Sequence, residues 1–67
     1  MSNYKFLFEA CKQHKEVSVF IPSLIPPYRA EIKGEILLVD DEETVIDTKK
    51  GPYTVKLHNI KGMIKYE

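Results

Sequence analysis

The chain has 67 residues, enough for one domain and too few for two. Its ten Lys and Arg residues balance its ten Asp and Glu residues, which argues against binding of nucleic acid by bulk positive charge. The single cysteine, Cys11, excludes an internal disulfide, and Cys11, His14 and His58 supply too few ligands for a structural zinc site. A domain this small, without a disulfide or a structural zinc site, is expected to gain stability by associating with copies of itself.

The sequence shows no charged-then-apolar leader and no apolar run long enough to span a membrane. We therefore expect a soluble, cytoplasmic protein with no membrane partner. Charge is distributed unevenly along the chain, because residues 34–48 carry six acids and no base, whereas residues 49–67 carry five lysines and one acid. The folded chain either presents one acidic and one basic surface or interleaves the two.

A helix is predicted over residues 1–16, at the start of a single domain of residues 1–67. Ser2 or Asn3 can cap its first turn. The apolar side chains recur at spacings of one, three and four, which places them on one stripe of the helix. That stripe comprises Phe6, Leu7, Ala10, Cys11 and, at its edge, His14, which we interpret as a packed histidine.

From Val17 onward the pattern changes to the alternation that is typical of β-strands. Five strands are predicted, over residues 17–21, 30–38, 44–48, 53–57 and 60–66. Gly34 lies in the middle of the second strand, where a glycine usually marks a bend or a close backbone approach. Within the second strand, one face is predicted to hold Ala30, Ile32, Ile36 and Leu38. Within the last strand, one face is predicted to hold Ile60, Ile64 and Tyr66, and in the fourth strand Tyr53, Val55 and Leu57 are predicted to point inward.

This order of elements predicts a mainly β fold, in which the helix precedes a strongly bent, five-stranded antiparallel small barrel over residues 17–67. An open sheet of five strands leaves unpaired edges that invite another chain. Partial closure of the sheet, with the remaining edges paired between subunits, removes that hazard and also compensates for the small core.

The order and spacing of these residues resemble the Sm, LSm and Hfq family. The family's first motif is matched by Val17, Val19, Ile21, Gly34, Ile36, Val39, Asp40, Thr44 and Val45, and its second by Val55-Lys56-Leu57-His58-Asn59-Ile60. The resemblance implies an Sm-like, SH3-like barrel that forms homo-oligomeric rings of about five to eight copies. The fourth strand of one subunit then pairs with the fifth strand of the next, through Tyr53, Val55, Leu57, Ile60, Ile64 and Tyr66.

The resemblance also implies an Hfq-like adaptor or chaperone that binds single-stranded RNA through two short turns. Carried over by position, the RNA-binding residues are Asp40, Thr44, Lys56, His58 and Asn59. In such a site an amide or hydroxyl reads a base edge, a cation meets phosphate and a ring stacks on a base. The chain departs from the family at Glu42, where an aromatic residue is common, and at Thr44, which replaces Asn. In a turn, an Asp more often holds backbone amides than reads a base, and we favour this structural role for Asp40.

Catalysis is not expected, because the sequence offers no nucleophile–base constellation and no glycine loop that could cradle a phosphate. No cofactor or metal is expected either. An alternative function is an Sm-like oligomeric scaffold that does not recognise RNA. Its protein partner would dock on the apolar loop at Leu24, Ile25 and Tyr28.

Overall fold

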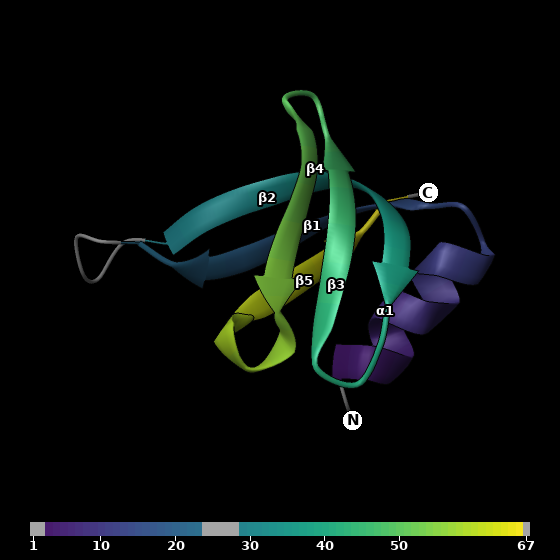
Figure 1. The fold of residues 1–67 in the computed structure, drawn as a ribbon, viewed down its shortest axis with the longest axis horizontal. Helices are drawn as coiled ribbons and strands as arrows, with labels where there is room; N and C mark the ends of the chain where they lie inside the picture. Colours follow the sequence, from purple (N-terminus) through teal and green to yellow (C-terminus); the bar gives the residue numbers. More distant parts are fainter. Residues whose placement is uncertain (1–2, 24–28, 67) are drawn as a thin grey trace.

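The structure is a computed structural model that describes residues 3–23 and 29–66. In this part of the chain, an N-terminal helix is followed by five antiparallel strands, with one 3₁₀ turn between the last two (Figure 1). This architecture confirms the predicted fold class. The predicted docking residues Leu24, Ile25 and Tyr28 lie outside the described residues. The elements are α1 (Asn3–Lys12), β1 (Glu16–Pro22), β2 (Arg29–Val39), β3 (Glu43–Thr48), β4 (Gly51–Lys56), η1 (Leu57–Asn59) and β5 (Gly62–Lys65).

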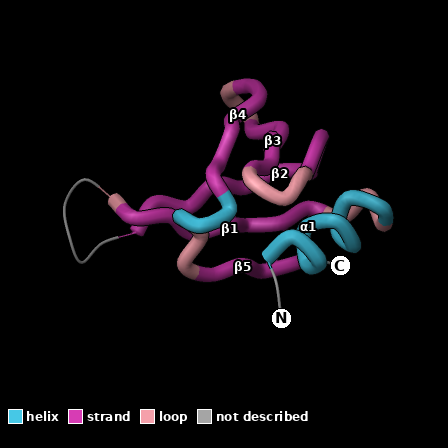
Figure 2. Tube along the Cα trace, turned by 60° about the horizontal axis from the view of Figure 1, so that its bottom comes forward, coloured by secondary structure: helices cyan, strands magenta, loops and turns pink. Residues whose placement is uncertain are grey.

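The five strands form one sheet in the order β4-β3-β2-β1-β5. The long strand β2 connects two parts of this sheet, because residues 29–35 pair with β1 and residues 35–39 pair with β3. Figures 1 and 2 show β3 and β4 crossing over β1 and β5, so that the sheet is strongly bent. Within the described residues β4 and β5 lie at the two edges, and the sheet is not closed between them.

Gly34 lies at the bend of β2, opposite Val17 of β1. A Cβ atom at this position would lie 2.2 Å from the carbonyl oxygen of Asp47 in β3. The backbone of β3 can approach β2 this closely only because Gly34 has no side chain. The close backbone approach predicted for this glycine is therefore confirmed.

Helix α1 packs against β2 and covers the core with Leu7 and Ala10, which are fully buried. The helix is shorter than the predicted 1–16 because a Schellman motif ends it. His14 adopts a left-handed φ of 54°, its N–H donates to the Cys11 carbonyl, and the Lys15 N–H donates to the Ala10 carbonyl. The prediction of a packed histidine is wrong, since the His14 side chain is 83% exposed and contacts Glu35 at 3.3 Å.

Two predicted inward-facing residues, Leu38 and Tyr53, are exposed. A β-bulge between Ile36 and Leu38 inserts an extra residue and reverses the alternation, so Leu38 points away from the core. Tyr53 lies opposite the buried Ile46, but β4 is an edge strand and no further strand covers the ring within the described chain.

The last strand is shorter than predicted: η1 ends at Asn59, residues 60 and 61 have no regular structure, and β5 spans Gly62–Lys65. Ile60 precedes the strand and is buried in the core, whereas Met63 is the strand residue that packs against the core. Ile64 is exposed, and Tyr66 places its hydroxyl 3.0 Å from the Ser18 hydroxyl on the opposite face of the sheet. The predicted common face of Ile60, Ile64 and Tyr66 is therefore wrong for Ile60.

Candidate nucleic-acid interface

The turn between β2 and β3 is held together by Asp40. One carboxylate oxygen of Asp40 accepts hydrogen bonds from the backbone N–H groups of Glu42 and Glu43, both at 2.8 Å. The Asp40 N–H donates to the Glu43 carbonyl at 2.9 Å and closes the turn. This geometry is the structural role that the sequence favoured for Asp40.

Several positive groups surround the Asp40 carboxylate. The backbone N–H groups of Glu43 and Glu42 hold the pKa of Asp40 below its ordinary value of 3.8, against the opposing effect of desolvation. The positive charge of Lys56, at the end of β4, lowers the pKa further. Asp40 is therefore ionised at neutral pH, and the Lys56 ammonium lies close enough for electrostatic attraction to its carboxylate.

The second turn, η1, lies beside the first (Figure 1). The Leu57 N–H donates to the Glu42 carbonyl at 2.9 Å and joins the two turns through their backbones. The Asn3 side-chain amide donates to the Leu57 carbonyl at 3.1 Å and joins the start of α1 to the same turn. The sequence assigned Asn3 to helix capping, and no sequence pattern pointed to this contact across the fold.

Lys56, His58 and Asn59 are exposed at this junction. Lys56 lies opposite Glu43 in the pairing of β4 with β3. An ammonium, an imidazole and an amide at adjacent positions can pair with phosphate, stack on a base and read a base edge, respectively. These three side chains are exposed members of the predicted RNA-binding set; Asp40 is exposed too, but one of its carboxylate oxygens is already bonded to the backbone of its own turn.

Thr44 occupies a different position from the other members of that set. Its side chain is fully buried, and its hydroxyl donates to the Leu38 carbonyl at 2.8 Å. That carbonyl lies beside the bulge of β2, so Thr44 satisfies a backbone acceptor where the strand pairing is irregular. Thr44 supports the first turn from within the core.

The charges near the two turns are mixed. The exposed acids Asp40, Asp41 and Glu42 form the first turn, and Lys56 lies close enough to Asp40 to lower its pKa. Strand β3 separates this turn from the other strongly charged turn, Lys49-Lys50, which lies at its far end (Figure 1). The two charged turns of the chain thus lie at opposite ends of β3.

The six predicted interface residues fall into two groups. Val55, Leu57 and Ile60 are buried in the core of their own chain. Tyr53 and Ile64 are 46% and 45% exposed, and Tyr66 is half-buried. Tyr53 and Ile64 are therefore the interface candidates with the largest side-chain surface free to contact another chain.

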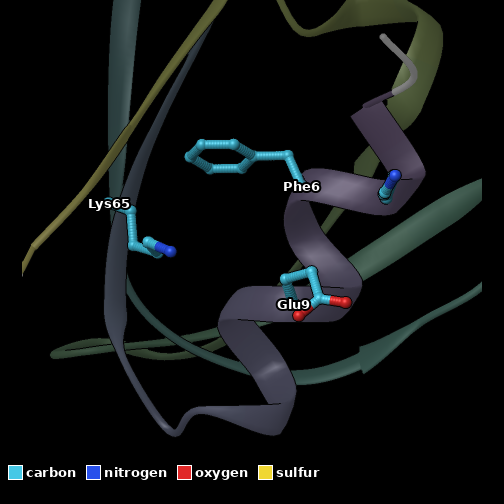
Figure 3. A pocket seen from close by; sticks show the side chains of 4 residues that line it. Phe6, Glu9 and Lys65 are labelled. Carbon is cyan, nitrogen blue, oxygen red and sulfur yellow. The ribbon is translucent and has the colours of Figure 1, made fainter.

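A pocket lies between α1 and β5, lined by Lys5, Phe6, Glu9 and Lys65 (Figure 3). The Phe6 ring points from the helix toward the strand. Lys65 donates a hydrogen bond to the Gln13 side chain at 3.2 Å and thereby links the strand to the end of the helix. The sequence assigned Phe6 to the core stripe and gave no sign of this pocket.

Two further structural findings concern metals and membranes. The described part of the chain contains no group of three His, Cys, Asp or Glu side chains placed to hold a metal ion. Within residues 3–23 and 29–66, no helix has the length and apolar character needed to cross a membrane.

Comparisons of the chain with protein-family models, with curated proteins and with solved structures find no match.

Proposed function

We propose that the chain is a ring-forming, Sm-like subunit that binds single-stranded RNA. The observation that carries this proposal is the strand order β4-β3-β2-β1-β5, which leaves β4 and β5 at opposite edges of an open sheet. A chain with one free edge on each side can pair head to tail with its copies, and such pairing closes into a ring when the rotation allows it. We also propose that it acts in the cytoplasm, where a free thiol such as Cys11 stays reduced.

The RNA contacts are assigned to Lys56, His58 and Asn59 at the junction of the two turns. These side chains are exposed, and the backbone bond from Leu57 to Glu42 fixes them beside the first turn. A ring repeats this small site in every subunit, so that weak individual contacts act together on one strand of RNA. Asp40 and Thr44 contribute by holding the shape of the first turn.

RNA titrations test this site with a matched pair of double variants. Replacing Lys56 and His58 by alanine is expected to weaken binding of a U-rich or A-rich oligonucleotide by roughly tenfold or more and to reduce its salt dependence. The control replaces Lys49 and Lys50, at the far end of β3, and is expected to bind nearly as well as the wild type. Equal loss of affinity in both variants would contradict the assigned site.

A second candidate function is an oligomeric scaffold without RNA recognition. The exposed acids Asp40, Asp41 and Glu42 favour it, because they lie on the turn that is joined to η1 and repel phosphate. The buried Thr44 favours it too, since its hydroxyl is already bonded to the backbone. This candidate predicts that the wild-type oligomer binds no RNA even at low salt.

A further inference from the structure

Each edge strand of the sheet carries one large exposed apolar side chain. These are Tyr53 on β4 and Ile64 on β5. Edge pairing between two copies could bring these side chains to the same face of the joined sheet or to opposite faces. The direction of the backbone hydrogen bonds decides between these arrangements, because it fixes which residues of an edge strand bond outward.

On β4, the odd-numbered residues bond inward to β3. The Leu57 N–H donates to Glu42, and hydrogen-bonded pairs alternate with non-bonded pairs in an antiparallel ladder. Val55 and Tyr53 therefore also bond to β3, whereas Thr54 and Lys56 direct their backbone groups outward. Pro52 lies at an outward position too, where its missing N–H costs no bond to β3.

On β5, the even-numbered residues bond inward to β1. The Tyr66 N–H donates to the Glu16 carbonyl at 2.9 Å, and the same alternation assigns Ile64 and Gly62 to β1. Met63 and Lys65 consequently direct their N–H and C=O groups outward. The outward groups of β5 thus belong to residues whose side chains lie on the core face, as the packing of Met63 shows.

Every strand pairing in this sheet is antiparallel, and we take the pairing of the two edges to be antiparallel as well. Such pairing joins Thr54 and Lys56 of one copy to Met63 and Lys65 of the next. Side chains of opposed residues lie on the same face. The intervening residues then share the other face, so Tyr53 of the first copy lies on the face of the second copy that bears Ile64 and Tyr66.

The choice of register does not change this result. Placing Lys56 opposite Lys65 is disfavoured by the repulsion of two ammonium groups. The register with Thr54 opposite Met63 places Tyr53 directly across from Ile64, and it brings Lys56 toward Lys61, which lies just before β5. The register with Thr54 opposite Lys65 places Tyr53 across from Tyr66 and diagonal to Ile64, still within reach of an aromatic ring.

On the receiving face, the Tyr66 side chain is held by contacts within its own chain. Tyr66 is held by its hydroxyl contact with the buried Ser18, at 3.0 Å, and by Lys33, whose ammonium lies 4.7 Å from the ring centroid. Gly62 has no side chain, so the surface beside Ile64 is open toward the Phe20 ring.

We propose that Tyr53 of one copy packs on Ile64 and Tyr66 of the next copy, on the face of the second copy's sheet that points away from the second copy's core. This inference rests on the edge pairing proposed above. The same alternation places Thr54 and Lys56 of the first copy on the side of Met63 and Lys65, beside the pocket in Figure 3. Tyr53 therefore does not enter that pocket.

Disulfide trapping between two singly substituted chains tests the inference. Both chains carry Cys11→Ser, which removes the native thiol; one adds Tyr53→Cys and the other Ile64→Cys or Tyr66→Cys. Opposed non-bonded pairs bring the two Cβ atoms to a separation that suits a disulfide. After mixing and mild oxidation, we expect a covalent heterodimer with at least one of these partners. Met63→Cys is the matched control, since its side chain lies on the other face.

The outcomes separate this inference from the proposed assembly. A Tyr53–Met63 disulfide that forms in preference to the Ile64 and Tyr66 disulfides would overturn the assigned face and leave the ring intact. An oligomer that forms none of these disulfides would overturn the inference as well. A monomeric wild-type chain would instead contradict the proposed function.

A second measurement does not depend on thiol chemistry. Tyr53→Ser and Ile64→Ser change exposed side chains, so the monomer fold should survive, as circular dichroism can verify. Each change is expected to raise the dissociation constant of the oligomer by roughly tenfold. The double variant should lose less than the product of the two single effects, because both changes remove the same contact. Full additivity would overturn the contact.

Discussion

At the scale of single residues, Gly34 is the position where the backbones of two strands nearly touch. Gly34→Ala would place a methyl group 2.2 Å from the Asp47 carbonyl oxygen, and backbone atoms on both sides would have to move. We expect this variant to lose about 1–3 kcal/mol of unfolding free energy, the usual cost of forcing extra volume into a packed site. Urea denaturation measures the loss.

Gly62 provides the matched control for this substitution. A Cβ atom there would meet only the Phe20 ring, at an ordinary contact distance of 3.7 Å. Gly62→Ala is therefore expected to change the unfolding free energy by about 0.5 kcal/mol or less. Similar losses in the two variants would show that the close contact with Asp47 does not constrain β2.

Asp40 gives the first turn a dependence on pH. Its folded pKa lies below the ordinary value, so the ionised carboxylate stabilises the fold above pH 3.8, and this contribution disappears as the pH falls through the lower folded pKa. Asp40→Asn keeps an acceptor oxygen but does not titrate. We expect the stability advantage of the wild type over this variant to be complete at pH 7 and to shrink as the pH falls below 3.8 through the lowered pKa of Asp40.

Urea denaturation of both proteins across this pH range measures that advantage. Asp40→Ala serves as the companion variant, because it also removes the acceptor of two backbone N–H groups. It should be the less stable of the two variants at every pH. A stability difference between wild type and Asp40→Asn that does not change with pH would contradict the charge effect.

At the scale of elements, the sequence predicted the helix and all five strands, because periodicity survives in the apolar stripes. It failed where one residue reverses that periodicity. The bulge before Leu38 and the 3₁₀ turn before β5 each shift the alternation, and neither has a local sequence signal. His14 was misassigned for a similar reason, since it extends the apolar spacing of the helix and yet adopts the left-handed conformation that ends it.

The candidate site was predictable only in part. The Asp40 turn follows from local chemistry, because an Asp side chain can accept bonds from N–H groups two and three residues ahead. The burial of Thr44 depends on its bond to Leu38 across the sheet, and the contact of Asn3 with Leu57 joins opposite ends of the chain. Tertiary contacts of this kind leave no pattern in a single sequence.

Strand β4 offers a sharp test of edge pairing at this scale. Thr54 directs its N–H outward, so Thr54→Pro removes a donor to a neighbouring copy without removing a bond to β3. We expect this variant to keep the circular dichroism spectrum of the wild type and to dissociate at concentrations where the wild type stays assembled. Thr54→Ala, which keeps the N–H, should stay assembled.

Val55→Pro is the positive control for damage to the fold. Val55 bonds inward to β3 and is buried, so proline there should unfold the chain. If Thr54→Pro assembles as tightly as Thr54→Ala, the edge of β4 takes no part in the contact between copies.

At the scale of the whole molecule, the core is small and aliphatic. Its fully buried hydrophobic residues, among those described, are Leu, Val, Ile and Ala, and the partly buried Phe6 is the aromatic ring packed against them. Large apolar side chains remain exposed at Tyr53 and Ile64, one on each edge strand. A core of this size gains stability when a neighbouring chain covers such surfaces.

The central claim, self-assembly through both sheet edges, is tested most directly by the mass of the native protein in solution. Native mass spectrometry and sedimentation equilibrium of the wild-type chain should give one closed oligomer of about five to eight copies, unchanged over a wide range of concentration. A monomer of 7.8 kDa at those concentrations would contradict the account.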